Sequence, residues 1–484
     1  MGFNLVRPVP SRGAGGRRPV ALPVLAAALL CCSGATAAGA QAPSVGDTLT
    51  LTLTEAVDRG LRDSEEVRSA RTGRRIADAH VTQARAGAFP QVSTSLVYTR
   101  TLASIFDDIS FGPPPGEVDD PGLGDMFGDL PFGRPNIWNA ALTVTQPLYS
   151  GGRIGTGLEI ARHVRRAADL EVVEAEAELA LQVRTAYFQT VLAGEFVAIA
   201  REAYELASAQ LERVELFRRQ GTASDFDVLR ARVERDNLEP SIVEARNARA
   251  VAELNLKRLI NVPAYQPVSL VTPLDPRLVD VDASVLRESL GRRAALGALD
   301  AVIAAREGAV QIARAERLPT FGMAATFAYQ SFPIPVTPID ADWRRDWMVS
   351  FQMSVPVFTG FRTHGQVQQT QGELDQARLQ RDQVREGMAL ELEAALGEFE
   401  SARAQIQARR ATVDEARRTL ELAELRFRSG LATQLDVSGA RLLLEQARVN
   451  EAQSLFNYMH ALARLERVSG GEIPLVTERM RSDG

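Results

Sequence analysis

Four segments of the chain alternate between apolar and polar residues with a period of two. In the last of them Trp347, Val349, Phe351 and Met353 fall on one side, and the residues between them are mostly polar. This period predicts β-strands with one apolar and one polar face. We expect these strands over the ranges Pro90–Thr101, Ile137–Leu148, Pro319–Ser331 and Asp346–Val357.

Two long proline-free stretches, about Ile154–Arg219 and Thr363–Ser429, carry a helical pattern instead. As single helices each would span roughly 100 Å, far more than a compact domain needs. Near the end of the second stretch the apolar residues are spaced by three and four positions, which is typical of coiled coils. These positions are Val413, Ala416, Leu420, Ala423 and Phe427.

Shorter helices are expected before and after each long one. Gly221 and Gly430 fit the ends of the long helices, and Ser224 and Thr433 fit the N-caps of the helices that return. One opening helix and one returning helix together match the length of one long helix, so we expect them to stack end to end beside it. The opening helices are expected over about Thr54–Ala88 and Ala283–Leu318, the returning ones over about Asp225–Ile260 and Gln434–Val468.

The same pattern occurs twice in the sequence. Ala84-Arg85-Ala86 recurs 229 residues later as Ala313-Arg314-Ala315, and the segments Pro147–Gly151 and Gly221–Ser224 recur 209 residues later. A period this long predicts a duplicated domain rather than a solenoid of short units. The predicted organisation is a signal peptide at 1–40, a first repeat at 41–282, a second repeat at 283–471 and a C-terminal tail at 472–484.

The first forty residues have the features of a secretory signal peptide. Four arginines precede an apolar run that is too short to span a bilayer, and Ala38-Gly39-Ala40 provides a small-residue cleavage site. Both cysteines, Cys31 and Cys32, lie in this segment, so we expect a mature chain without cysteine. Such a chain cannot be a disulfide scaffold or a thiol enzyme.

Composition excludes several classes of protein. The net charge of −6 argues against nucleic-acid binding, which normally needs a basic face. The sequence has one lysine, Lys257, with no glycine-rich turn before it, so a P-loop NTPase is excluded. The four histidines are scattered without a metal-binding or catalytic spacing, so we expect no catalytic residues, no metal and no cofactor. The acidic segment from Asp107 to Asp129 is expected to be a solvated loop rather than a calcium site.

The amphipathic strands allow two interpretations. In a soluble sandwich their polar face meets water; in an outer-membrane barrel the apolar face meets lipid and the polar face lines an aqueous lumen. Strands of about 10–13 residues are long enough to cross a bilayer when tilted. Four strands cannot enclose a useful pore, so a barrel would have to combine strands from several copies of the chain.

These features together resemble the TolC family of outer-membrane efflux proteins. The resemblance rests on the duplication, the two segments Pro147–Arg153 and Pro356–Arg362, and the two turns that begin at Gly221 and Gly430. It implies a mainly α fold with a small β part: a homotrimer with a 12-stranded outer-membrane barrel and a helical coiled-coil barrel in the periplasm. It also implies a passive exit duct for an efflux or type I secretion system, working with a periplasmic adaptor and an inner-membrane pump.

The resemblance assigns expected roles to three groups of residues. Asp436, Asp227 and Phe427 would lie at the periplasmic mouth, where Asp436 from three copies would form an acidic ring favouring cations. The alternative for both aspartates is a role at the start of a helix. A tyrosine and an arginine that latch the mouth in some members correspond here to Phe427 and Ala432, so that latch is not expected.

The two turns are the expected adaptor contacts, and one face of the strands is expected to meet outer-membrane lipid. The turn residues are Gly221, Thr222, Ala223, Ser224, Gly430, Leu431, Ala432 and Thr433. The lipid-facing residues are Trp138, Leu142, Val144, Trp347, Val349, Phe351 and Met353. The alternative function is a periplasmic coiled-coil adaptor or scaffold without a barrel, which would not account for the duplicated amphipathic strands.

Overall fold

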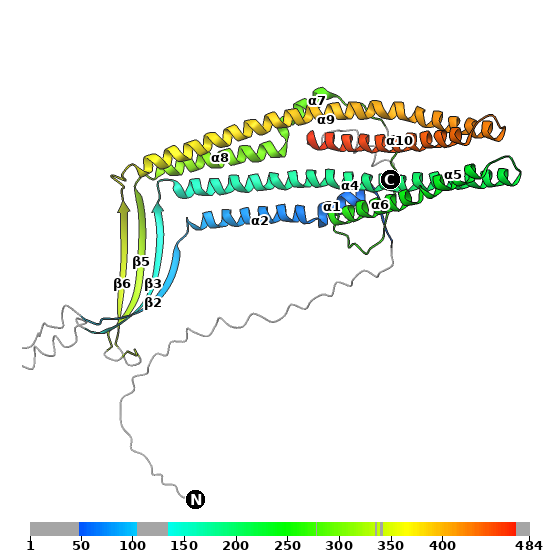
Figure 1. Ribbon diagram of the computed structural model, residues 1–484. Coiled ribbons are helices and arrows are strands. Elements are labelled where there is room, and N and C mark those ends of the chain that lie inside the picture. The colour runs from blue at the N-terminus through cyan, green and yellow to red at the C-terminus, as the bar shows by residue number, and fades with distance from the viewer. Residues whose placement is uncertain (1–47, 104–133, 277, 334–335, 339–341, 471–484) are drawn as a thin grey trace, which may run out of the picture. The chain divides into compact units, whose positions relative to one another are not determined.

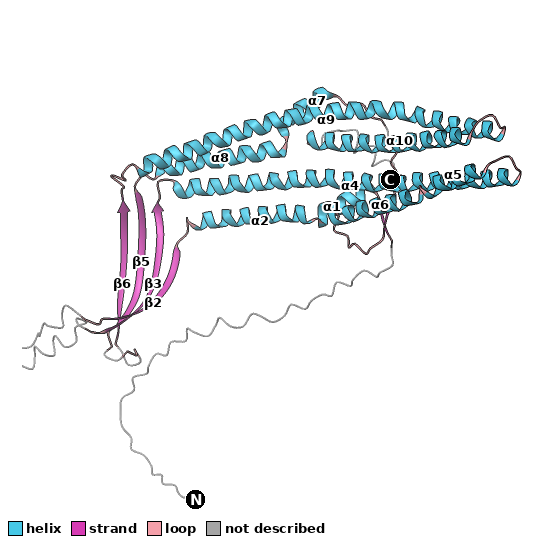
Figure 2. Ribbon diagram, viewed as in Figure 1, coloured by secondary structure: helices cyan, strands magenta, loops and turns pink. Residues whose placement is uncertain are grey.

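The computed structural model describes residues 48–103, 134–276, 278–333, 336–338 and 342–470. The predicted signal peptide, the acidic loop and the predicted C-terminal tail lie outside these residues. The part that is described contains long helices and a four-stranded sheet (Figures 1 and 2).

In the described residues the large helices and the strands of the large sheet follow the same order in both halves. The first half runs through β1 (Leu49–Leu51), α1 (Leu53–Asp63), α2 (Glu65–Ala86), β2 (Gln91–Arg100), β3 (Asn136–Tyr149), α4 (Arg153–Arg219), α5 (Asp225–Asp236), α6 (Glu239–Leu259) and β4 (Val268–Leu270). The second runs through α7 (Ala283–Ser289), a 3₁₀ turn (Leu290–Arg292), α8 (Ala294–Ala315), β5 (Thr320–Ser331), β6 (Trp343–Ser354), α9 (Arg362–Arg428) and α10 (Gln434–Val468). Both long helices therefore have 67 residues, as the pattern predicts.

The prediction of one continuous opening helix in each half is wrong. The chain becomes extended at Ser64, between α1 and α2, and at Arg293, just before α8. These positions are 229 residues apart, which is the offset between the two repeats in this region. Ser64 interrupts the helix because its hydroxyl accepts the backbone N–H of Glu66, at 3.2 Å, and so caps a new helix. The break at Arg293 directs a buried side chain towards α4 and α9.

Other element boundaries also differ from the prediction, and β6 ends at Ser354 rather than at Val357. The first returning helix is divided into α5 and α6 at Asn237-Leu238, because Pro240 lacks the N–H that a continuous helix would need. Strand β6 begins at Trp343, three residues earlier than expected, because it pairs along its whole length with β5, up to Ser331.

The large sheet has the strand order β2-β3-β5-β6, and all of its pairs are antiparallel. Its register brings the apolar residues of neighbouring strands onto one face. Val92, Val144, Ala325 and Val349 form one row of the apolar face. The neighbouring row, Ser93, Thr143, Thr326 and Met348, belongs to the opposite face, on which most residues are polar. Within this chain β2 and β6 form the two edges of the sheet.

The short helices stack along the long ones, as expected. Helices α8 and α10 follow one another along α9, and α2, α1, α6 and α5 lie along α4 (Figure 1). Helix α4 also packs on α8 and α10, which joins the two halves. Within the described residues, no helix is both long enough and apolar enough to cross a membrane.

The main apolar core lies near the middle of the long helices and includes two fully buried tyrosines. Tyr187 on α4 donates to the carbonyl of Leu51 and accepts from the N–H of Thr272, both at 2.9 Å. These bonds attach α4 to the ends of a small parallel ribbon, β1–β4, that the sequence pattern does not reveal. Tyr458 on α10 accepts the N–H of Val279 at 2.9 Å.

Lys257 also lies in this region and is buried. Its ammonium donates to the carbonyl of Ala264 at 3.2 Å and pairs with Glu253 at 2.7 Å. It therefore closes the end of α6 rather than projecting into solvent.

Candidate functional site

The two helix–turn–helix tips have the same backbone geometry. Gly221 and Gly430 have φ values of +78° and +71°, in the left-handed region that favours glycine. In each tip the N–H of the residue after the glycine bonds back to the long helix, from Thr222 to Phe217 at 2.9 Å and from Leu431 to Arg426 at 2.8 Å. The turn residues are exposed except for Ala223 and Ala432, which are half-buried.

Asp227 and Asp436 complete capping boxes at the starts of α5 and α10. The carboxylate of Asp436 accepts the N–H of Thr433 at 2.7 Å and its hydroxyl at 2.8 Å. Asp227 accepts the N–H and the hydroxyl of Ser224 at 3.0 and 2.7 Å. Both aspartates therefore have the helix-start role that the sequence allows. The acidic ring of Asp436 stays a prediction.

These hydrogen bonds hold the pKa of both aspartates below the ordinary value. For Asp436 the backbone bond from Thr433 lowers the pKa most, followed by the hydroxyl bond. For Asp227 the hydroxyl bond of Ser224 is the larger cause, followed by the backbone bond. Each tip therefore carries an ionised carboxylate at neutral pH.

Phe427 lies between the two hairpins. Its ring is 5.9 Å from that of Phe217 on α4. It packs against two small apolar clusters, one within α9–α10 and one within α4–α5. The expected mouth residue therefore contacts both hairpins of the same chain.

Polar contacts that the sequence pattern does not reveal connect the hairpins beside Phe427. Arg213 on α4 pairs with Glu424 on α9 at 3.1 Å. Glu234 on α5 accepts the hydroxyl of Ser438 at 2.7 Å and lies 3.5 Å from Arg441, both on α10. The repeat offset contains a usable signal, because Glu424 and Arg441 are the equivalents of Glu215 and Arg232. In the first hairpin Glu215 and Arg232 pair with one another at 3.4 Å. In the second hairpin their equivalents do not pair together: Glu424 and Arg441 each pair with a residue of the first hairpin.

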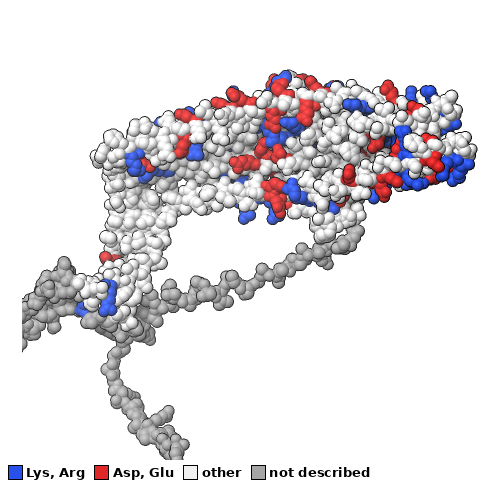
Figure 3. All heavy atoms as spheres, in the orientation of Figure 1, with Lys and Arg blue, Asp and Glu red and all other residues white. Residues whose placement is uncertain are grey.

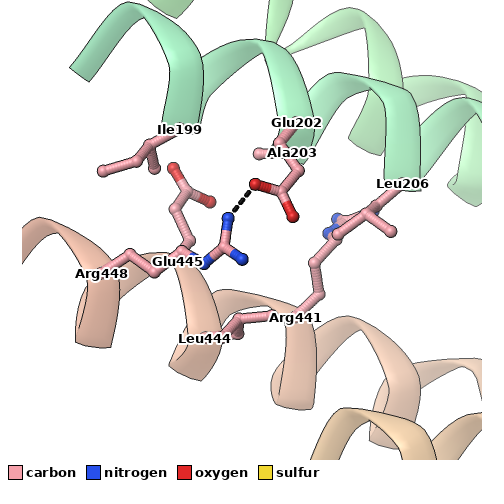
Figure 4. A pocket seen from close by; sticks show the side chains of 8 residues that line it. All are labelled: Ile199, Glu202, Ala203, Leu206, Arg441, Leu444, Glu445 and Arg448. Carbon is pink, nitrogen blue, oxygen red and sulfur yellow. Dashed lines mark hydrogen bonds and ion pairs between the residues drawn. The ribbon is translucent and has the colours of Figure 1, made fainter. Parts of the chain in front are cut away.

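A small hollow separates α4 from α10 further from the tips. Figure 4 shows Arg448 reaching from α10 to the carboxylate of Glu202 on α4, with Leu206 and Leu444 on the same two helices. Its lining residues are Ile199, Glu202, Ala203, Leu206, Arg441, Leu444, Glu445 and Arg448. The contact between the hairpins here combines the Arg448–Glu202 ion pair with apolar side chains such as Leu206 and Leu444, and each hairpin also has an apolar cluster of its own.

All seven residues predicted to face lipid lie on one face of the sheet. The pairing places Leu142 beside Phe327 and Phe327 beside Trp347. Trp347 and Phe351 are 77% and 72% exposed in the single chain, far more than core aromatic residues would be. Figure 3 shows almost no charge over these strands, whereas acidic and basic side chains mix over the helices.

Aromatic residues gather at the end of this face that is remote from the helices. All three tryptophans of the chain, Trp138, Trp343 and Trp347, lie there. Trp138 is half-buried, its ring lies tilted against that of Tyr98 at a centroid distance of 4.9 Å, and its indole N–H donates to the carbonyl of Val336 at 2.9 Å. Amphipathic aromatic side chains concentrate at the boundary between lipid and water. The face therefore has the pattern of a strand surface in contact with a bilayer.

The chain thus combines an amphipathic sheet with two open edges and two hairpins built on long helices. The chain belongs to the outer membrane efflux protein family, whose family model matches residues 56–262 and 285–471. This is a family of channels in the outer membrane rather than a class of enzymes.

Solved structures share the fold. The chain is similar to the Campylobacter jejuni CmeC outer membrane channel, with a TM-score of 0.72 and 17% identity over 87% of this chain and 85% of that one. It is also similar to the outer membrane protein VceC from Vibrio cholerae, with a TM-score of 0.70 and 19% identity over 87% and 96% of the two chains.

Protein CyaE of Bordetella pertussis is a more similar relative in sequence. It is 28% identical over 324 residues, which are 66% of this chain and 62% of that protein. The aligned region therefore spans less than two thirds of the length of this relative.

Proposed function

We propose that three copies of this chain form an exit duct through the outer membrane. The duct receives solutes from an inner-membrane pump through a periplasmic adaptor, in a tripartite efflux or type I secretion system, and passes them outward without using energy itself. The observation that carries this proposal is the four-stranded sheet, with one apolar face, one polar face and both edges open. Three such sheets joined edge to edge give a 12-stranded barrel with its apolar face towards lipid.

The helices also support a trimer in which neighbouring copies meet along the β2 and β6 edges of their sheets. Helix α9 packs on α8 and α10, and α2 and α6 pack on α4, so α9 lies at one side of the helical layer and α2 with α6 at the other. Both sides carry exposed apolar residues in the single chain. On the side of α2 and α6 they lie on α5, which precedes α6 along α4, and are Phe226, Leu229 and Val233. On the other side they lie on α9 and are Leu422 and Leu425. A second copy would cover them as it paired β6 with β2.

The cross-hairpin contacts give the duct a closed mouth. Arg213–Glu424, Arg441–Glu234 and Phe217–Phe427 hold the α9–α10 hairpin against α4 and α5. Separating the hairpins breaks two ion pairs and one aromatic contact, and each hairpin keeps the buried residues of its own apolar cluster. The mouth therefore opens at a modest cost, and the exposed turns at Gly221 and Gly430 are the surface offered to the adaptor.

The test is fractionation of the cell envelope, followed by mass determination of the detergent-extracted protein and conductance measurements in planar bilayers. A trimer from the outer membrane that conducts ions supports the duct. A periplasmic monomer without conductance contradicts it and favours the coiled-coil adaptor or scaffold.

A further inference from the structure

Two arginines and two glutamates form a closed ring of ion pairs where α10 ends and α8 begins. Arg293 contacts Glu174 on α4 at 3.1 Å and Glu391 on α9 at 3.2 Å. Arg467, in the last turn of α10, contacts the same two glutamates at 3.1 and 3.0 Å. Every member therefore has two partners of opposite charge, and we name these four residues the arginine–glutamate ring.

The ring is well shielded from water at its centre. The side chain of Arg293 is 3% exposed, and the side chains of Glu174 and Glu391 are 28% and 32% exposed. Glu178 on α4 adds a further contact to Arg467 at 2.8 Å. Shared partners restrict the side chains of one another, and a planar guanidinium can serve two carboxylates at once. A lysine could not satisfy this geometry.

The equivalent junction in the first repeat is built differently. Ser64 stands where the second repeat has Arg293, and Arg258 stands where it has Arg467. Arg258 makes a single exposed pair with Glu66 at 3.4 Å. The duplicated halves have thus diverged at this point, and the second one ties its junction to both long helices.

Packing between the two halves differs on either side of the ring. Towards the strands α4 and α8 interlock closely, because a Cβ on Gly308 would meet Ile160 at 2.6 Å and one on Gly297 would meet Leu170 at 3.1 Å. Towards the tips the contact combines ion pairs, such as Arg213–Glu424, with the aromatic pair Phe217–Phe427. There Gln210 and Gln434 are more than nine-tenths buried, and the described residues offer their side-chain amides no hydrogen-bond partner.

We propose that the arginine–glutamate ring is the fixed point about which the α9–α10 hairpin turns when the periplasmic mouth opens. This inference rests on the proposed function, and it assigns Arg293 as a positioning residue for the gate. The ring holds the end of α10 against α4 and α9, so that movement towards the tips cannot loosen the interlocked helices on the strand side. Without the ring, the hairpin would leave α4 and α5 more often.

The test is hydrogen–deuterium exchange on the full-length protein extracted in detergent, compared between the wild type and Arg293→Met. The fixed-point role predicts that exchange increases about tenfold at 413–428 and 434–447, far from the substitution. Arg287→Met is the matched control, because Arg287 makes an exposed pair with Glu393 on the same long helix. It should leave the tips unchanged.

Glu391→Gln gives a second route if Arg293→Met fails to assemble, since it removes one charge of the ring and keeps the side-chain shape. Combining Arg293→Glu with Glu391→Arg should restore part of the protection at the tips. Faster exchange confined to the ring itself, at 290–297 and 464–470, shows a purely local role and overturns the inference. The exchange experiment does not depend on conductance. If the protein never conducts ions, the proposed duct function is contradicted, but the exchange rates at the tips still test the role of the arginine–glutamate ring.

Discussion

The guanidinium of Arg213 on α4 donates to both oxygens of Glu424 on α9, at 3.1 and 3.5 Å. This bidentate ion pair joins two hairpins, each of which has a buried apolar cluster of its own. The equivalent of Glu424 in the first repeat, Glu215, pairs with Arg232 inside its own hairpin. The two repeats therefore use the same carboxylate for different contacts, one within a hairpin and the other between the two hairpins.

Arg213→Met should increase the conductance of the trimer in planar bilayers. The substitution removes the charge and keeps the stem, and losing a partly exposed pair costs about 1 kcal/mol, enough for a severalfold rise in the open population. Arg232→Met is the control, because it removes a pair within one hairpin. Equal conductance changes in the two variants would argue against a latch at Arg213.

Asp436→Asn should reduce the preference of the channel for cations, and Asp227→Asn should change it less. The two residues make the same capping contacts, so both substitutions weaken a helix cap in the same way. A difference in selectivity between the variants therefore does not come from the lost cap. The measurement is the reversal potential in a salt gradient. Unchanged selectivity in Asp436→Asn would rule out the acidic ring.

The tips should loosen in acid. Hydrogen bonds lower the pKa of Asp227 and Asp436 in the folded chain, below the 3.8 of an unperturbed aspartate. Their contribution to stability is therefore fully present above 3.8 and disappears as the pH falls through the lower folded value. Exchange at 221–230 and 430–440, sampled across acidic pH and corrected for intrinsic rates, should show this loss. Substituting both aspartates with asparagine should reduce the pH dependence, and Asp225, which pairs with Arg218, remains in both proteins.

Phe351→Arg should prevent assembly in the outer membrane, whereas Gln352→Arg should be tolerated. The two residues are neighbours on β6 but belong to opposite faces of the sheet. A charge on the lipid face of a barrel strand costs about 2–4 kcal/mol near the middle of the bilayer. Heat-resistant trimers in isolated outer membranes are the measurement. Similar yields of the two variants would mean that Phe351 does not face lipid.

Gly308→Ala should lower the thermal stability of the protein. The added methyl group would collide with Ile160 on α4, and overpacking of this kind costs about 1–3 kcal/mol. Gly155→Ala is the matched change, since a Cβ there meets nothing within 4 Å in the chain. Stability is measured by thermal unfolding of the detergent-extracted protein, and equal midpoints would contradict the close contact.

Local patterns were sufficient to predict most of the fold. The period of two predicted the strands and the face that carries their apolar residues, and the absence of proline predicted α4 and α9 to within one residue at each end. The helix break at Arg293 could not be predicted, because an arginine within a helical pattern is ordinary. Its position is set by partners 98 and 119 residues away. The β1–β4 ribbon was missed for a similar reason, since its three-residue strands depend on Tyr187 from another element.

The same limit applies to the candidate site. Glycines and caps are local signals, so the turns and the roles of Ser224 and Thr433 could be predicted. The contacts of Arg213 and Glu234 join helices that are distant in sequence, and their residue types are common on any helix surface. Only the comparison of the two repeats marks Glu424 and Arg441 as unusual.

Lys257 has a practical consequence for chemical labelling. The one lysine of the sequence is buried and holds its ammonium against Glu253 and the carbonyl of Ala264. Amine-reactive dyes and crosslinkers therefore find the folded chain almost inert apart from its terminal amine. A fluorophore attached in this way marks each subunit once, so photobleaching steps count the copies in a complex directly. Conversely, the appearance of a second labelled amine reports that the end of α6 has opened.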